Sequence, residues 1–248
     1  MRLLTKSVLL AAAAAFTFSM TASAATFSEF RLDQSGSDAS EYIELFGTPG
    51  ESLDGLHIII IGDGTGAGAG GAVEGIIDLT GSSIPADGYF LIAETTFGTG
   101  GLGLTGSVDL TTNVNFENSD NLTLLLVTAL NDSINVGSGF GGSDLDVDDD
   151  NVIDASGDYG GDGGDDGAPF GSIVDELGIV ETVGSGDLVY SSTTVGPDGS
   201  FVPANAFLCS TGWQIGAFGG GDDTPGVANN CPVPVQNKSW GEIKRTIN

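Results

Sequence analysis

The stretch His57-Ile58-Ile59-Ile60-Ile61 decides the fold class, because consecutive β-branched residues favour a β-strand that is buried on both faces. Two later stretches, Tyr89–Ala93 and Leu122–Val127, repeat this signal. Polar and apolar residues alternate along Glu41–Phe46, as in a strand with two different faces. Turn-forming residues separate these stretches, and no helical period is visible within residues 25–230. The pattern predicts an all-β protein, an antiparallel sandwich or barrel.

The composition of the chain limits the partners that it can bind and the reactions that it can catalyse. The 248 residues include 34 Asp and Glu but only 6 Lys and Arg, so the formal net charge is -28. A chain of this charge repels phosphates, and we expect no nucleic-acid partner bound through a basic surface. The only histidine is His57, which we interpret as structural because no nucleophile motif such as GxSxG accompanies it. We therefore expect no enzyme.

The N-terminus has the pattern of a secretory signal peptide. Arg2 and Lys6 precede an apolar or small stretch, Ser7–Met20, and Ala22-Ser23-Ala24 supplies a small-x-small cleavage motif. We predict cleavage after Ala24, so that residues 1–24 are a signal peptide and the mature chain is secreted, extracellular or periplasmic. The alternative is an uncleaved anchor helix, but the stretch is short for one, and we expect no transmembrane span in the mature chain.

Two cysteines lie late in the chain. An oxidising compartment makes a disulfide between Cys209 and Cys231 the expected state, with two free thiols as the alternative. No CxxC motif and no nearby histidine support a zinc site.

A Gly- and Asp-rich segment at about residues 137–171 interrupts the strand pattern, which returns at Ser172–Leu177 and Asp187–Tyr190. Apolar residues are sparse in this segment, and its acidic part contains no Lys or Arg. Because strand-like sequence lies on both sides, we interpret the segment as an insertion into one domain, residues 25–231. Residues 232–248 form a C-terminal tail, for which we expect a short amphipathic helix or a frayed end.

Within the insertion, the spacing of aspartates suggests a calcium loop. Asp recurs at relative positions 1, 3, 5 and 9, as Asp146, Asp148, Asp150 and Asp154. Alternate carboxylates of one tight loop are the oxygen ligands that calcium uses. Position 6 is Asn151, which tolerates the left-handed backbone needed there, and Asp144 or Asp158 could complete the ligand set. Position 12 is Gly157 instead of Glu, so the match to an EF-hand is partial. The alternative is a solvated loop of like charges.

Several of these stretches together resemble the lamin-tail domain. The similar stretches are Phe27–Phe30, Glu41–Phe46, Leu53–Leu56, Ile84–Leu91 and Asn118–Leu124. Ile173–Gly178 resembles the strand that closes that domain, whereas the acidic insertion departs from its compact pattern. The resemblance implies an immunoglobulin-like sandwich made of residues 26–130 and 172–230. We expect these side chains to face inward: Ile43, Leu45, Ile59, Ile61, Leu91, Leu124 and Val174.

The later part of the chain resembles the lamin-tail region of secreted bacterial proteins that carry a downstream endonuclease/exonuclease/phosphatase domain. Val195–Pro203 and Asp223–Asn229 carry this likeness. We expect no nuclease domain here, and the resemblance transfers no catalytic residue. The preferred hypothesis is a secreted, non-catalytic module, calcium-stabilised, that binds an unknown surface or extracellular partner or has an adhesive or structural role. One alternative is a hydrolase, either with carboxylate chemistry that shows no recognisable motif or as a shortened relative of a secreted nuclease or phosphatase. The other is an accessory that targets another enzyme or a polysaccharide.

Overall fold

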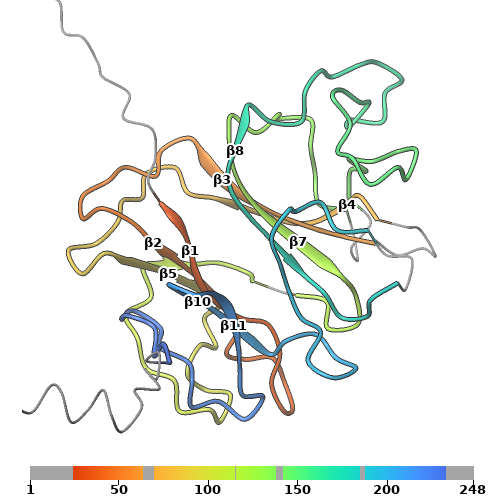
Figure 1. Ribbon diagram of the computed structural model, residues 1–248. Coiled ribbons are helices and arrows are strands. Elements are labelled where there is room, and N and C mark those ends of the chain that lie inside the picture. Colours follow the sequence, from red (N-terminus) through yellow and green to blue (C-terminus); the bar gives the residue numbers. More distant parts are fainter. Residues whose placement is uncertain (1–24, 64–69, 115, 138–141, 185–187, 233–248) are drawn as a thin grey trace, which may run out of the picture.

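The computed structural model describes residues 25–63, 70–114, 116–137, 142–184 and 188–232, and the regular structure in these residues is β-strand throughout (Figure 1). The strands are β1 Thr26–Arg31, β2 Tyr42–Phe46, β3 Leu56–Gly62, β4 Ala72–Asp78, β5 Tyr89–Ala93, β6 Leu110–Thr111, β7 Leu122–Thr128, β8 Ser172–Ile179, β9 Thr194–Val195, β10 Asn205–Cys209 and β11 Gly212–Gly216. Across the same described ranges, no helix is long and apolar enough to cross a membrane.

The strands form two sheets that pack face to face. The first sheet has the order β11-β10-β1-β2-β5-β6, and the second has the order β4-β3-β7-β8-β9. Neighbouring strands run antiparallel, except that the two-residue edge strands β6 and β9 pair in parallel with β5 and β8. The prediction of an all-β sandwich with a long Gly- and Asp-rich insertion is confirmed.

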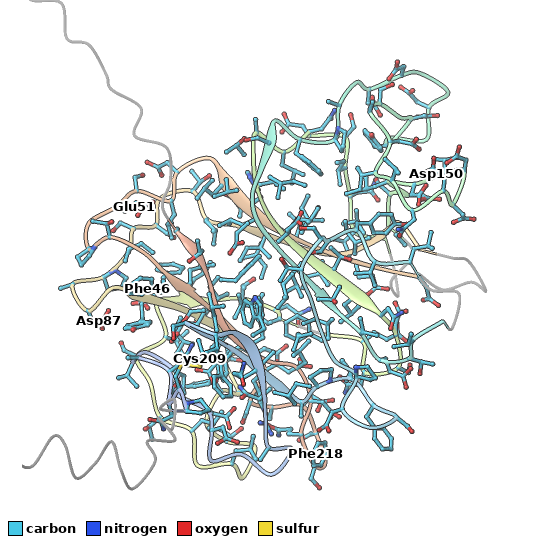
Figure 2. The ribbon with its side chains drawn as sticks, in the orientation of Figure 1. Phe46, Glu51, Asp87, Asp150, Cys209 and Phe218 are labelled. Carbon is cyan, nitrogen blue, oxygen red and sulfur yellow. A yellow bond between two sulfur atoms is a disulfide. The ribbon has the colours of Figure 1, made fainter. Side chains whose placement is uncertain are left out.

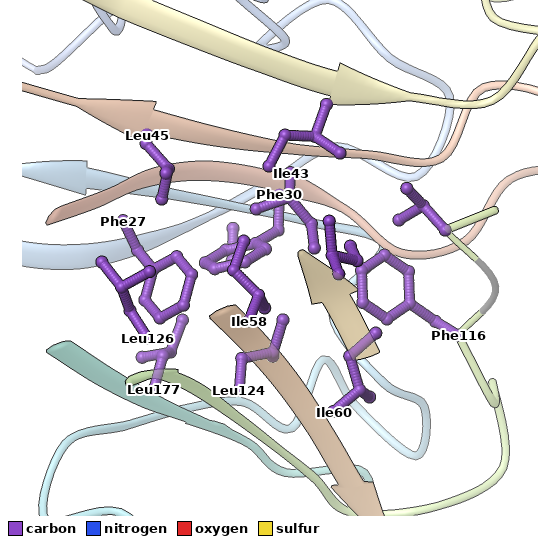
Figure 3. Close-up of a cluster of buried hydrophobic side chains, with 14 of the residues drawn as sticks. Phe27, Phe30, Ile43, Leu45, Ile58, Ile60, Phe116, Leu124, Leu126 and Leu177 are labelled. Atoms are coloured by element: carbon purple, nitrogen blue, oxygen red, sulfur yellow. The ribbon is translucent and has the colours of Figure 1, made fainter. Parts of the chain in front are cut away.

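The main core lies between the two sheets, as Figure 3 shows. Successive side chains of a strand lie on opposite faces, so mostly alternate residues point into it. In β1, an irregularity between Phe27 and Glu29 brings both Phe27 and Phe30 to this face. The first sheet contributes Phe27, Phe30, Ile43 and Leu45, and the second contributes Ile58, Ile60, Leu124, Leu126 and Leu177. Burial of each such side chain contributes roughly 1.5–3 kcal/mol.

Three of the expected inward-facing residues point the other way. Ile59 and Ile61 lie on the outer face of the second sheet, and Leu91 lies on the outer face of the first. All three are buried, because loops cover both outer faces. An uninterrupted apolar run has no alternation, so its sequence does not show which parity faces the opposite sheet. Ile43, Leu45, Leu124 and Val174 do pack in the main core, Val174 as a partly buried residue.

The acidic insertion connects β7 to β8, which pair side by side in the second sheet. From the end of β7 it folds over the outer face of that sheet (Figure 1). Its Leu145 and Tyr159 pack there against the outward isoleucines of β3. The backbone of the insertion also bonds to the start of β4, where the Val73 amide donates to the Ser143 carbonyl. The insertion is therefore packed onto the sandwich by its few apolar residues.

Two smaller expectations have definite outcomes. Cys209, at the end of β10, forms a disulfide with Cys231, as predicted. The strand expected at 187–190 is absent: residues 188–190 form no strand, and Tyr190 is buried against the outer face of the second sheet. Residue 187, residues 1–24, for which a signal peptide is predicted, and residues 233–248 of the tail lie outside the described residues.

Candidate metal centres

The predicted aspartate loop brings three carboxylates together. Oxygen atoms of Asp146, Asp148 and Asp150 lie within 4.8 Å of one another. Asp146 is buried, whereas Asp148 and Asp150 are exposed on the outside of the insertion, where Figure 2 labels Asp150. This arrangement leaves one side of the group open to water and could hold a metal ion.

Asp146 is the anchor of this loop. Its carboxylate accepts hydrogen bonds from the Asp150 amide at 3.1 Å and the Asn151 amide at 3.0 Å. The Tyr190 hydroxyl donates to the same carboxylate at 2.8 Å. Asn151 has a φ of 67°, the left-handed conformation expected for position 6 of the loop. The fold of the loop is therefore fixed from beneath by a buried acid and a buried tyrosine.

The other two predicted calcium ligands, Asp144 and Asp154, do not join this group of carboxylates. Asp144 and Asp154 lie outside the group of three, and each accepts a hydrogen bond from the backbone of the loop. The donors are the Asp146 amide, 3.0 Å from Asp144, and the Val147 amide, 3.1 Å from Asp154. In this structure both residues brace the loop.

The loop is electrostatically unfavourable as an ion-free group. The negative charge of Asp150 is the main cause that raises the pKa of Asp148, and burial is the main cause that raises the pKa of Asp144. The sequence places only one Lys or Arg among the described residues, Arg31, and it is paired with Asp223 on the first sheet. Hence no cationic side chain of the described surface neutralises the loop, and a divalent cation would reverse the repulsion.

A second group of carboxylates was not predicted. Asp63, Glu74 and Asp120 have oxygen atoms within 4.8 Å of one another, and Glu74 and Asp120 are buried. Asp63 follows β3, Glu74 lies in β4 and Asp120 precedes β7. Because β4 and β7 flank β3 in antiparallel register, these positions meet at one end of the second sheet. The Asp63 amide donates to Asp120 at 2.7 Å.

A close approach of backbone and acids makes this second group possible. A Cβ atom on Gly62 would lie 2.4 Å from an oxygen of Glu74 and 2.6 Å from an oxygen of Asp120, so a larger residue here would displace these carboxylates. The three acids are far apart in sequence and form no spacing motif. The one available signal is Glu74, an acid inside an otherwise apolar strand.

The first sheet holds a third set of acids, which is closed to solvent. Glu29 and Glu44 face each other on β1 and β2, and both are fully buried. Residues 217–231, which we call the C-terminal strap, cover them. Thr224 donates to Glu29 from its amide and its hydroxyl, and the Gly226 amide donates to Glu44. Burial raises the pKa of Glu29, and that of Glu44 to about 8.

The strap is also held by Arg31. Its guanidinium lies 3.2 Å from Asp223 and donates to the carbonyl oxygens of Ala217 and Phe218. Both charged side chains of this pair are buried. These acids therefore hold the fold together and present no open carboxylate pair to a substrate.

Comparison of the chain with protein-family models, with curated proteins and with solved structures finds no match. The likeness to the lamin-tail domain accordingly stays a prediction from the residues.

Proposed function

We propose that this chain is a secreted, non-catalytic module of the lamin-tail type, whose acidic insertion binds calcium, and that it has a binding, adhesive or structural role at the cell surface. The all-β sandwich and the Cys209–Cys231 disulfide agree with an extracellular module. The observation that carries the calcium assignment is the meeting of Asp146, Asp148 and Asp150 on one hydrogen-bonded loop.

Calcium suits this loop better than magnesium does. Calcium accepts six to eight oxygen ligands in flexible geometry, including water and backbone carbonyls, whereas magnesium demands a small octahedral shell. The group offers carboxylate oxygens on an open surface, so water would complete the coordination. An open site of this kind predicts weak affinity, with a Kd on the order of 0.1–1 mM, typical of extracellular modules.

Isothermal titration of the mature protein with calcium chloride tests the proposal. The double variant Asp148→Asn plus Asp150→Asn keeps the shape of the loop and removes two charges; we expect it to lose the calcium heat. The matched control is Asp162→Asn plus Asp165→Asn, which removes the same charge from the same insertion outside the group of three. Equal heats from all three proteins would contradict the assignment. A Glu74→Gln variant reports whether the second group contributes.

The hydrolase alternative with carboxylate chemistry, as in glycosidases, requires an accessible pair of carboxylates. Glu29 and Glu44 form the pair that the first sheet offers, but the strap seals both. This burial favours the non-catalytic proposal. A nuclease and phosphatase assay of the mature protein, with Glu44→Gln as the comparison, tests the alternative directly.

A further inference from the structure

Ala25, the residue before β1, is held by both its side chain and its backbone nitrogen. It is fully buried and belongs to the main core between the sheets. Its amide donates to the Glu51 carboxylate, labelled in Figure 2, with 3.0 Å between the Ala25 nitrogen and Oε1 of Glu51. Because the residue is packed in the core, its nitrogen has a defined position in front of this carboxylate.

The Glu51 carboxylate is itself fixed by the turn between β2 and β3. Its second oxygen, Oε2, accepts the Thr48 amide at 3.1 Å. The backbone of Glu51 is held as well, because its amide donates to the Thr48 carbonyl and its carbonyl accepts the Ile84 amide. A carboxylate held in this way loses little rotamer freedom when it binds a charged donor at Oε1.

Cleavage after Ala24, which the sequence predicts, would change the chemistry of the Ala25 nitrogen. In the uncleaved chain this nitrogen belongs to a neutral peptide group with one N–H. Hydrolysis of the Ala24–Ala25 bond consumes one water, leaves a carboxylate on Ala24 and leaves an α-amino group on Ala25. Such an amine is mostly protonated at neutral pH. A hydrogen bond between an ammonium and a carboxylate is roughly twice as strong as one between neutral groups.

The surroundings of this nitrogen favour a positive charge. Asp175 of β8 accepts the Phe27 amide at 2.7 Å, so a second acidic side chain binds the same strand two residues further on. The only Lys or Arg among the described residues is Arg31, which lies at the other end of β1 and is paired with Asp223. The bond from Ala25 is only partly buried, which limits the cost of removing the charges from water.

We propose that cleavage after Ala24 creates an ion pair between the Ala25 ammonium and the Glu51 carboxylate, which holds the start of β1 and makes the cleaved chain more stable than the uncleaved one. The inference rests on the signal peptide of the proposed function and adds a structural consequence of its removal. It also depends on the exact position of the cut. A cut one residue earlier leaves an amide at Ala25 and moves the ammonium by about 3.8 Å along the chain.

Two proteins with defined first residues test the pairing. One begins at Ala25 and the other at Ala24, both extend to Asn248, and both are released from an N-terminal fusion without extra residues. Glu51→Gln, made in each, keeps an oxygen acceptor for the Thr48 amide and removes the charge. In urea denaturation at pH 7, we expect it to lower the folding equilibrium constant at least about fivefold in the protein that begins at Ala25 and at most about twofold in the other.

The matched control is Glu117→Gln. Glu117 is also partly exposed, and it accepts the Ser119 hydroxyl at 3.2 Å. This substitution should have the same effect on stability whichever residue comes first. Equal effects of Glu51→Gln on the two proteins overturn the proposal.

Reactivity of the α-amine gives an independent measurement. An acylating reagent attacks only the unprotonated amine, so an ion pair slows the reaction. At pH 7 the Ala25 amine should react at least about tenfold more slowly in the folded protein than in the urea-unfolded protein, and Glu51→Gln should remove most of this protection. Mass spectrometry of the N-terminal peptide measures the rates. Equal rates for the folded and the unfolded protein overturn the proposal.

The processing step is tested on the chain that cells export. Its intact mass should correspond to a chain that begins at Ala25, and another first residue overturns the role of the pair in maturation. Calcium titration of the protein that begins at Ala25 tests the proposed function separately, because Glu51 lies outside the group of Asp146, Asp148 and Asp150. Loss of the ion pair and loss of calcium binding are therefore distinct results.

Discussion

The two outer faces of the sandwich are covered in opposite ways. On the first sheet, the C-terminal strap (217–231) is held by buried charged and polar groups, namely Arg31, Glu29 and Glu44. On the second sheet, the insertion is held by apolar contacts such as those of Leu145 and Tyr159, and it keeps its Asp148 and Asp150 in water. The strap and the insertion both contain Asp and Gly residues, but the acids have different roles. The acids beneath the strap bind it to the sheet, whereas Asp148 and Asp150 of the insertion are exposed to water.

This difference separates structural acids from acids that are available to a ligand. A buried carboxylate must be hydrogen-bonded, paired with a cation or protonated, because an isolated buried charge is costly. Glu29, Glu44 and Asp223 meet this demand through the strap. An exposed carboxylate is solvated and can exchange water for a metal ion. The acidic residues of the chain therefore fall into two groups: buried carboxylates that stabilise the fold, and exposed carboxylates that a ligand can reach.

The largest expected effect comes from breaking the charge pair beneath the strap. Asp223→Ala leaves the Arg31 guanidinium buried without its carboxylate, which costs about 3–5 kcal/mol in comparable buried pairs. Urea denaturation of the protein measures the loss. The control is Asp162→Ala on the exposed part of the insertion, for which we expect a change of about 0.5 kcal/mol or less. Similar losses for both variants would show that the strap is not held by this pair.

The insertion should respond to loss of an apolar contact. Leu145 is fully buried against the second sheet, and Leu145→Ala should cost about 2–4 kcal/mol through lost burial and the cavity left behind. The strap should be unaffected, so limited proteolysis should cut first within the insertion. Cleavage that begins in the strap instead would contradict the separation of the two covers.

The buried glutamates predict that stability falls with rising pH. Burial raises the pKa of Glu44 to about 8 and that of Glu41 to about 9, above the ordinary value of 4.5. The folded state therefore binds more protons than the unfolded state between these values, and its stability is full below about pH 4.5 and is lost as the pH rises through 8–9.

The size of this pH effect can be assigned to single residues. We expect a loss of about 1–3 kcal/mol between pH 5 and pH 9, measured as the urea midpoint at each pH. Glu44→Gln keeps an acceptor for the Gly226 amide and should flatten part of the slope. A flat profile in the parent protein, or an unchanged slope in the variant, would refute the assignment.

These contrasts also show how far the sequence could lead. The strands at 57–61, 89–93 and 122–127 could be predicted because β-branched and apolar runs report burial directly. Which of Ile58 and Ile59 faces the opposite sheet could not be predicted, because both faces of the strand are buried. The predicted disulfide needed only a pair of cysteines and an oxidising compartment.

The candidate sites also differ in whether they could be predicted from the sequence. Asp146, Asp148 and Asp150 could be predicted because a local loop places alternate residues together. The group of Asp63, Glu74 and Asp120 could not, because strand pairing and not spacing brings it together. The covering of Glu44 by the strap depends on a segment at the other end of the chain, which the alternation of β2 does not reveal.

The smallest expected effect is that of calcium, and it should act on one cover alone. At 2 mM calcium and a Kd on the order of 0.1–1 mM, mass action stabilises the folded state by about 1 kcal/mol. Calcium should slow proteolysis of residues 142–171 and leave the strap unchanged, since the strap acids are buried and already hydrogen-bonded. Magnesium at the same concentration should protect less, because it loses its own water reluctantly.

Asp148→Asn plus Asp150→Asn should abolish the calcium protection and slightly stabilise the ion-free protein, because the charge of Asp150 no longer acts on Asp148. Equal protection of insertion and strap would instead indicate a general salt effect, and the contrast between the two covers would then lie only in their packing.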